Sequence, residues 1–121
     1  MTAPARRFLF CTYEGGGHVG PMVLVARAAQ DRGHAVLVVS DACNAPDAAA
    51  AGVPFEPWRT APNRADKDPA GDPLRDWEAA NPAEVIDQLC RRLLIGPAVD
   101  YVIDVRAIAA EFRPDVIVSQ E

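Results

Sequence analysis

The stretch TYEGGGHVGP at residues 12–21 lies between a continuous apolar run and a segment whose apolar residues recur at helical spacing. Before it, the unbroken apolar run at residues 8–11 is typical of a strand buried on both faces. From about Val19 to Arg32, apolar residues recur every three or four positions, which predicts a helix that ends before Gly33. A glycine-rich turn between a strand and a helix lies at the carboxyl edge of a parallel sheet, where α/β proteins bind ligands.

The same alternation of strand and helix continues along the chain. Apolar runs at residues 35–39, 53–55 and 116–118 predict three more strands, the third of them at a sheet edge because it contains Pro54. Helical patterns cover residues 42–51, 82–95 and 98–112. This order predicts an α/β fold, a Rossmann-like parallel sheet with flanking helices and right-handed crossovers.

The segment at residues 57–81 differs from the rest because it is rich in proline and aspartate. We expect a long mobile loop there, with a helical turn near residues 74–80. Asn81, Pro82 and Glu84 form the start signal of the next helix, with the asparagine as N-cap and the glutamate as the capping-box acid. The run at residues 93–95 within that helix is expected in the core.

Composition excludes several classes of protein. The chain has 121 residues, half of them apolar, and a net charge of −5 with no basic run. Such a surface is unsuited to duplex nucleic acid, which requires clustered lysine and arginine. No apolar stretch is long enough for a membrane span or a signal peptide. Three widely spaced cysteines predict reduced thiols rather than disulfides or a zinc site, and hence a cytoplasmic protein.

One interpretation of the turn is a dinucleotide site. Gly15, Gly17 and Gly20 fit the fingerprint of NAD- and FAD-binding proteins, and Asp41 follows the second strand where a ribose-binding acid would lie. An oxidoreductase segment is therefore an alternative. Two features oppose it: the imidazole of His18 at the mouth of the helix, and a proline directly after the third glycine, where helix and strand must pack closely.

A second interpretation centres on His18. A neutral imidazole can accept a proton from a hydroxyl nucleophile, and general-base catalysis of this kind contributes about 10²- to 10⁴-fold. A hydrogen-bond acceptor on the other ring nitrogen would fix the tautomer. A helix-start histidine held only by backbone hydrogen bonds remains the simpler reading of the residue by itself. His34 lies in a turn before a strand and is given no role.

The turn, the following apolar helix, the segment Arg32–Val36 and the segment Phe112–Ser119 together resemble a known family. They are similar to the N-terminal domain of GT-B nucleotide-sugar-dependent glycosyltransferases, in the style of the bacterial enzymes that glycosylate antibiotics and other natural products. The resemblance implies that residues 1–121 are a partial acceptor-binding domain, and that a C-terminal nucleotide-sugar domain is absent. It also implies inverting transfer as part of a longer chain, with the isolated segment inactive. A complete four-strand domain and a non-catalytic binding domain remain alternatives.

The resemblance also implies roles for residues near the turn. His18 would be the catalytic base that deprotonates the acceptor hydroxyl. The family usually places an aspartate after the strand at residues 116–118 to support this base, whereas here Gln120 and Glu121 occupy the matching positions. Glutamine carries no charge to stabilise an imidazolium, and neighbouring strand residues point to opposite faces, so only one of the two can serve.

The remaining site residues follow from the same resemblance. The donor would be a UDP- or TDP-sugar whose diphosphate meets the turn at Gly15, Gly16 and Gly17, with no metal and no tightly bound cofactor. The acceptor would be a hydrophobic small molecule. Aromatic and apolar walls suit flat aglycones, and the candidates for those walls are Tyr13, Met22, Trp58 and Trp77. The tryptophans could equally pin the loop to the core.

Overall fold

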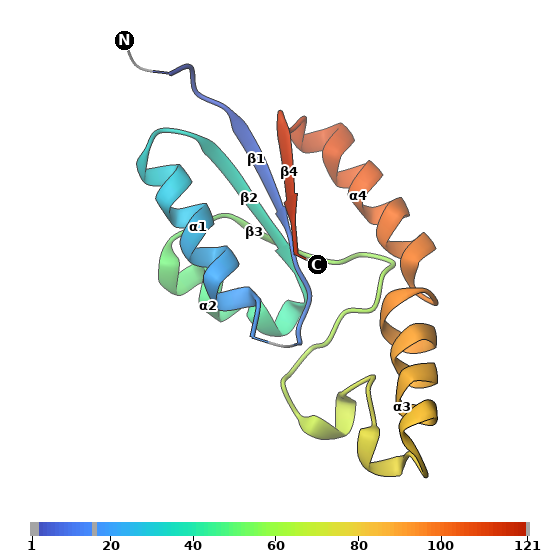
Figure 1. Cartoon of the computed structure of the whole chain (residues 1–121). Coiled ribbons are helices and arrows are strands. Elements are labelled where there is room, and N and C mark those ends of the chain that lie inside the picture. Colours follow the sequence, from blue (N-terminus) through green and yellow to red (C-terminus); the bar gives the residue numbers. More distant parts are fainter. Residues whose placement is uncertain (1–2, 16, 121) are drawn as a thin grey trace.

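The computed structural model describes residues 3–15 and 17–120. Four parallel strands form one sheet in the order β3-β2-β1-β4, which confirms the predicted Rossmann-like α/β fold. Helices α1 and α2 cover one face and α4 covers the other, while the loop after β3 and helix α3 extend beyond the carboxyl edge (Figure 1). The strands are β1 (Arg7–Cys11), β2 (Ala35–Ser40), β3 (Phe55–Pro57) and β4 (Val116–Ser119). The α-helices are α1 (Val19–Asp31), α2 (Ala45–Ala51), α3 (Pro82–Gln88) and α4 (Ala98–Phe112).

The two central strands divide their side chains between two hydrophobic clusters. Phe10 and Val38 point toward α1 and α2, where they pack with Val23 and Ala26. Leu9, Cys11, Leu37 and Val39 point the opposite way and pack in a second cluster with residues of α4. The two-residue period of a strand thus explains why the runs are apolar throughout, because both faces are covered by helices.

Local signals in the sequence set most element ends. Helix α1 ends before Gly33, which has a φ of 87°, and α2 ends at Gly52, with a φ of 69°. These are left-handed conformations that glycine adopts without a steric cost. Asn81 caps α3 as predicted, since its Oδ1 accepts a hydrogen bond from the Glu84 amide at 3.1 Å. The Glu84 carboxylate accepts a hydrogen bond from the Ala80 amide at 2.8 Å. This completes a capping box in which the acid bonds the residue before the N-cap rather than the N-cap itself.

Two predictions of local structure are wrong in detail. The third strand begins at Phe55 rather than Val53, because Val53 is buried in the cluster beside α2 while Phe55 pairs with Val38. The helix expected at residues 82–95 is α-helical only to Gln88 and continues as a π-helical segment, Leu89–Leu94. The run at residues 93–95 is not core: Leu94 and Ile95 are 51% and 70% exposed.

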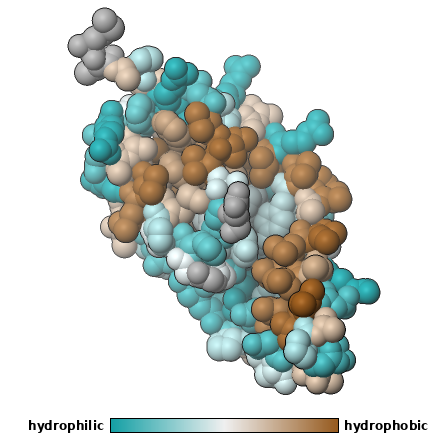
Figure 2. Space-filling model, viewed as in Figure 1, coloured by the Kyte–Doolittle hydropathy of each residue, from teal (hydrophilic) through white to brown (hydrophobic). Residues whose placement is uncertain are grey.

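An apolar surface remains on the outer side of α4 and at β4. Val99, Val102 and Ile103 on α4 are at least half exposed, and Ile117 on β4 is 49% exposed. Figure 2 shows brown hydrophobic surface along the side where Figure 1 places α4. No helix within the described residues is both long and apolar enough to cross a membrane.

Candidate functional site at the carboxyl edge

The glycine-rich turn joins β1 to α1 at the edge where all four parallel strands end. Gly15 and Gly17 have φ values of 154° and 76°, which residues other than glycine rarely adopt. His18 occupies the N-cap position of α1, and its carbonyl oxygen accepts a hydrogen bond from the Met22 amide at 3.2 Å. Its imidazole is exposed to solvent. The turn therefore presents the ring outward, where a bound molecule could reach it.

Asp41 supports the turn from β2. Its side chain is only 4% exposed, and each carboxylate oxygen accepts a backbone amide hydrogen bond. Oδ1 accepts from Glu14 at 2.7 Å and Oδ2 from Arg64 at 2.8 Å. These contacts clamp the glycine-rich turn to the loop after β3. The same carboxylate would be the ribose-binding acid of a dinucleotide site, but its oxygens already serve the backbone.

A cavity of about 270 Å³ opens beside the turn, between the sheet and the helices that follow the loop. Its floor is formed by residues that end β1 and β4, including Thr12 and Gln120. Most of the wall is aromatic or aliphatic. The residues that line the cavity come from five segments and are Cys11, Thr12, Tyr13, Trp58, Leu93, Leu94, Tyr101, Val105, Ser119 and Gln120.

Trp58 forms a fixed wall of this cavity. Its indole Nε1 donates to the Thr12 carbonyl oxygen at 3.0 Å, and its ring is 4% exposed. Tyr101 meets it edge to face, with ring centroids 4.9 Å apart. Trp58 therefore both pins the loop to the sheet and faces the cavity.

The segment after Trp58 is held by a buried carboxylate on α4. Asp104 is 1% exposed and accepts hydrogen bonds from the backbone amides of Arg59, Thr60 and Ala61 and from the Thr60 hydroxyl. Burial raises the pKa of this carboxyl, but the four donors outweigh burial, and the net pKa lies below its usual value. Asp104 thus stays charged and fixes the position of the tryptophan wall.

The polar groups of the cavity are mostly uncharged. Burial raises the pKa of the Cys11 thiol to about 11, so the sulfur is protonated at neutral pH and is no nucleophile. Burial, reinforced by the charge of Asp41, raises the pKa of the Tyr101 hydroxyl to about 12. Tyr101 is therefore a hydroxyl that can donate a hydrogen bond. The cavity suits an apolar molecule with few polar atoms.

Gln120 lies directly after β4 and faces this cavity. Its Oε1 accepts a hydrogen bond from the Thr12 hydroxyl. Within residues 3–15 and 17–120, no hydrogen bond joins Gln120 to the His18 imidazole. The neighbouring candidate Glu121 lies outside the described residues, as does Gly16 of the turn.

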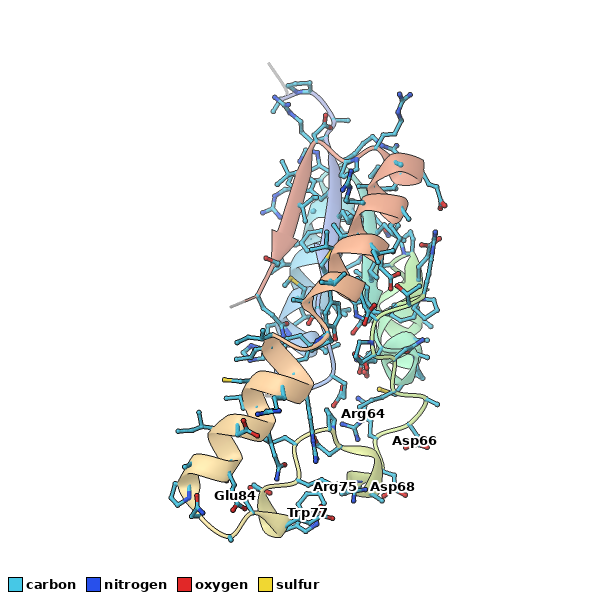
Figure 3. All side chains as sticks on the ribbon, turned by 90° about the vertical axis from the view of Figure 1, so that its right-hand side faces the viewer. Arg64, Asp66, Asp68, Arg75, Trp77 and Glu84 are labelled. Carbon is cyan, nitrogen blue, oxygen red and sulfur yellow. The ribbon has the colours of Figure 1, made fainter. Side chains whose placement is uncertain are left out.

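The structure brings together only some of the predicted acceptor residues. Tyr13 and Trp58 line the cavity. Met22 packs on the opposite side of the sheet, against the cluster formed with α1 and α2. Trp77 is 59% exposed, and Figure 3 shows it beyond the carboxyl edge near Arg75, in the loop before α3. Neither Met22 nor Trp77 lines this cavity, because α1 turns Met22 toward the other face and the loop carries Trp77 outward.

A second cavity, of about 250 Å³, lies on the outer side of the turn. Gly15, Gly17 and Gly20 line it together with Lys67, whose ammonium contacts the Asp47 carboxylate at 3.2 Å. Glu14 and Asp47 place two carboxylates in the same wall, so the cavity offers backbone amides but no excess of positive charge. The described residues contain no group of three or more potential metal ligands, and their three cysteines are free thiols.

Several residues of the site were not singled out from the sequence. Tyr101 and Leu93 line the cavity although their spacing assigned both to the apolar faces of helices. Asp104 was missed entirely. Its place between Tyr101 and Ile108, three and four residues away on the buried face of α4, was a usable signal. A carboxylate on a buried helix face must have hydrogen-bond donors near it.

No family model matches the sequence, and no curated protein matches it. Several solved structures do. A glycosyltransferase of kitacinnamycin superposes with a TM-score of 0.66 at 20% identity, over 97% of this chain and 25% of that one. CalG4, the calicheamicin glycosyltransferase, superposes with a TM-score of 0.67 at 22% identity, over 97% of this chain and 27% of that one. SsfS6 from Streptomyces sp. SF2575 superposes with a TM-score of 0.59 at 24% identity, over 94% of this chain and 33% of that one.

The chain thus spans between a quarter and a third of the length of these structures. Identities this low establish a likeness of fold. The four-stranded parallel sheet with its flanking helices is therefore a fold that this chain shares with part of these GT-B glycosyltransferase structures.

Proposed function

We propose that this chain is the acceptor-binding N-terminal part of an inverting glycosyltransferase that acts on a hydrophobic natural product. The observation that carries the proposal is the apolar cavity at the carboxyl edge, which is lined by Thr12 and Tyr13 of the β1–α1 connection. His18 lies further along the same connection, at the N-cap of α1, and lines neither of the two cavities described above. The likeness of fold to glycosyltransferases supports it. In this arrangement the acceptor ring system lies against Trp58 and Tyr101.

The proposed reaction needs one proton acceptor from this chain. The His18 imidazole takes the proton of the acceptor hydroxyl, and the oxygen attacks the anomeric carbon of the sugar. The bond from that carbon to the diphosphate breaks on the opposite face, so the configuration inverts and the nucleoside diphosphate leaves with its electron pair. General-base assistance of this kind contributes about 10²- to 10⁴-fold.

The donor would be a nucleotide sugar. A related solved structure, VinC, is in complex with dTDP, and one structure of SsfS6 is complexed with thymidine diphosphate. In our proposal the diphosphate meets the backbone amides of the glycine-rich turn at the N-terminus of α1, whose partial positive charge favours an anion. The base and sugar of the donor would be held by a second domain.

The decisive experiment is His18→Ala, measured as glycosyl transfer in a protein that contains this segment together with a nucleotide-sugar domain. We expect a loss of about 10²-fold or more. His34→Ala is the matched control. His34 lies at the opposite edge of the sheet, where its Nδ1 accepts a hydrogen bond from the Arg6 amide. A loss under threefold in the His18 variant would remove the base assignment and favour a non-catalytic binding domain.

A second experiment concerns the group that supports the base. Gln120→Asp places a charge at the first position after β4. A higher transfer rate would assign the supporting role to this position, because a carboxylate stabilises an imidazolium and an amide does not. An unchanged rate would point to Glu121, or to a different match between the end of this strand and the family's pattern.

A further inference from the structure

Tyr101 carries a hydroxyl group that none of its described neighbours uses. Among those residues the hydroxyl has no hydrogen-bond partner, and yet it is not one of the side-chain atoms that are shut off from solvent without a partner. Those enclosed atoms are Asn44 Oδ1, Arg64 Nε and Gln120 Nε2. The Tyr101 oxygen is therefore both unpaired and accessible to a molecule that enters the cavity it lines.

The ring of Tyr101 has a fixed position that does not depend on this hydroxyl. The ring meets Trp58 edge to face, with centroids 4.9 Å apart and an interplanar angle of 84°. The Tyr101 backbone amide donates to the Pro97 carbonyl oxygen at 3.1 Å, in the first turn of α4. A phenylalanine would keep both contacts, so packing does not account for the oxygen atom.

Tyr101 lies at the boundary between two hollows of different character. Together with Tyr13 and Leu93 it lines both the cavity of about 270 Å³ and a neighbouring recess of about 20 Å³. The recess is large enough for about one water molecule. Its lining includes four charged residues, Glu14, Asp41, Arg64 and Arg92. A molecule in the larger cavity would thus keep an apolar body there and direct a polar edge toward Tyr101.

The Tyr101 hydroxyl is suited to donate to that polar edge. Burial, reinforced by the charge of Asp41, raises its pKa to about 12, so the proton stays on the oxygen at neutral pH. A phenolic hydroxyl donates more readily than it accepts, because its lone pair is delocalised into the ring. The group that matches this donor is an oxygen with free lone pairs, such as a carbonyl oxygen.

Other hydroxyl groups of the cavity are less suited to this role. The Thr12 hydroxyl is engaged with Gln120. Ser119 is exposed, so water competes for its hydroxyl. The Tyr13 ring lies over Gly15 of the turn, where an added Cβ atom would be 3.4 Å from its Cε2. Tyr13 is therefore the alternative that the experiment has to separate from Tyr101.

We propose that Tyr101 is a specificity-determining residue, whose hydroxyl donates a hydrogen bond to a carbonyl oxygen of a flat, apolar ring bound in the larger cavity. The inference rests on the proposed function, in which this cavity holds the acceptor. It adds the substrate class: an aromatic or fused-ring acceptor that carries a ketone, lactone or quinone oxygen on the edge that faces Tyr101. A volume of about 270 Å³ is near the lower end for small-molecule sites, so small bicyclic compounds are the suitable probes.

The test compares 1-tetralone with tetralin, which has the same two rings but no carbonyl oxygen. Each is titrated into the ¹⁵N-labelled 121-residue chain, and its dissociation constant is measured from ¹H–¹⁵N correlation spectra. The chain has two tryptophans. The indole signal of Trp58 in the cavity wall should shift with both probes, whereas that of the exposed Trp77 should not.

Tyr101→Phe removes the hydroxyl and keeps the ring. It should weaken binding of 1-tetralone about three- to tenfold and leave the tetralin affinity within about twofold. Val102→Ala, the next residue on α4 and 55% exposed on the outer side, is the matched control and should change neither affinity. In the wild type labelled with ¹³C at tyrosine Cζ, the Tyr101 signal should shift further with 1-tetralone than with tetralin. That signal is identified by its loss in Tyr101→Phe.

The outcomes separate the inference from the proposed function. A loss of affinity in Tyr101→Phe that is confined to 1-tetralone supports the role of Tyr101. An equal change for the two probes, or a selective loss in Tyr13→Phe instead of Tyr101→Phe, overturns that role and leaves the cavity as a ring-binding site. Binding of neither probe to the wild type overturns the inference and also the acceptor site of the proposed function.

Discussion

Thr60 donates twice to the carboxylate of Asp104, once from its backbone amide and once from its hydroxyl. The amide nitrogen lies 2.9 Å from Oδ2, and the hydroxyl oxygen lies 2.6 Å from Oδ1. These bonds join the loop after β3 to α4 across 44 positions of sequence. Since the loop residue Trp58 forms a wall of the cavity, this pair contributes to both the stability and the shape of the site.

Asp104→Asn should destabilise the chain by about 3 kcal/mol. An asparagine offers one acceptor oxygen, and its amide group would face backbone N–H donors. The measurement is the free energy of unfolding in urea. Asp100→Asn, one turn earlier on α4 and half-buried, is the control and should change stability by less than about 1 kcal/mol. Equal losses in both variants would contradict the role of Asp104.

The same carboxylate should make stability depend on pH. Burial raises the Asp104 pKa, but the hydrogen bonds from Thr60, Ala61 and Arg59 lower it more, so the folded-state pKa lies below the unfolded one. The unfolded state then binds the proton more readily. The contribution is present above the unfolded pKa and is lost as the pH falls through the folded pKa. Between pH 6 and pH 3 the wild type should lose more stability than Asp104→Asn, and parallel curves for the two would contradict this.

Asp41→Asn tests whether this residue clamps the turn or binds a ribose. Its two oxygens accept from the Glu14 and Arg64 amides, so we expect a loss of about 2 kcal/mol in the free energy of unfolding. The surface variant Asp47→Asn, which loses an exposed pair with Lys67, should lose less than about 1 kcal/mol. NAD should not protect the wild type from thermal unfolding. Protection by NAD that Asp41→Asn removes would revive the dinucleotide interpretation.

Gly96→Ala should disrupt the junction between the π-helical segment and α4. A Cβ atom at this position would overlap the Arg91 backbone carbonyl, which cannot move aside as a flexible side chain could. We expect a loss of about 2 kcal/mol or more in urea unfolding. Gly71→Ala meets no atom within 4 Å and should stay within about 0.5 kcal/mol of the wild type. Similar stabilities for the two variants would show that the junction adjusts without cost.

Much of the fold could be predicted because periodicity and end signals agreed. Helix α1 begins at Val19, as predicted, and ends one residue before the expected end, and β2 extends one residue further than predicted. The π-helical segment could not be predicted, because it inserts its extra residue into a pattern that reads as an ordinary helix. At the end of this segment the Gly96 backbone approaches the Arg91 carbonyl so closely that a Cβ atom would not fit, and the spacing of apolar residues does not indicate that approach.

The site could be predicted only in part for a similar reason. Tyr13 and Trp58 follow strands, so their place at the carboxyl edge came from topology. Tyr101 and Leu93 were assigned to helix faces, and the sequence cannot distinguish a helix face that fills a core from one that lines a cavity. The contact between Gln120 and Thr12 joins residues 108 positions apart, and no local sequence pattern predicts it.

The division of β1 and β2 into two clusters has a consequence for how this chain can change over time. Even-numbered residues such as Phe10 and Val38 meet α1 and α2, whereas odd-numbered residues such as Leu9 and Val39 meet the side that carries α4 and the cavity. Both faces are core: Leu9 and Val39 are as fully buried as Val38, and of the odd-numbered residues in these strands Cys11 lines the cavity. Since the two clusters share no residue, we expect a loss of stability from truncation on one face to add to, rather than alter, a loss from truncation on the other.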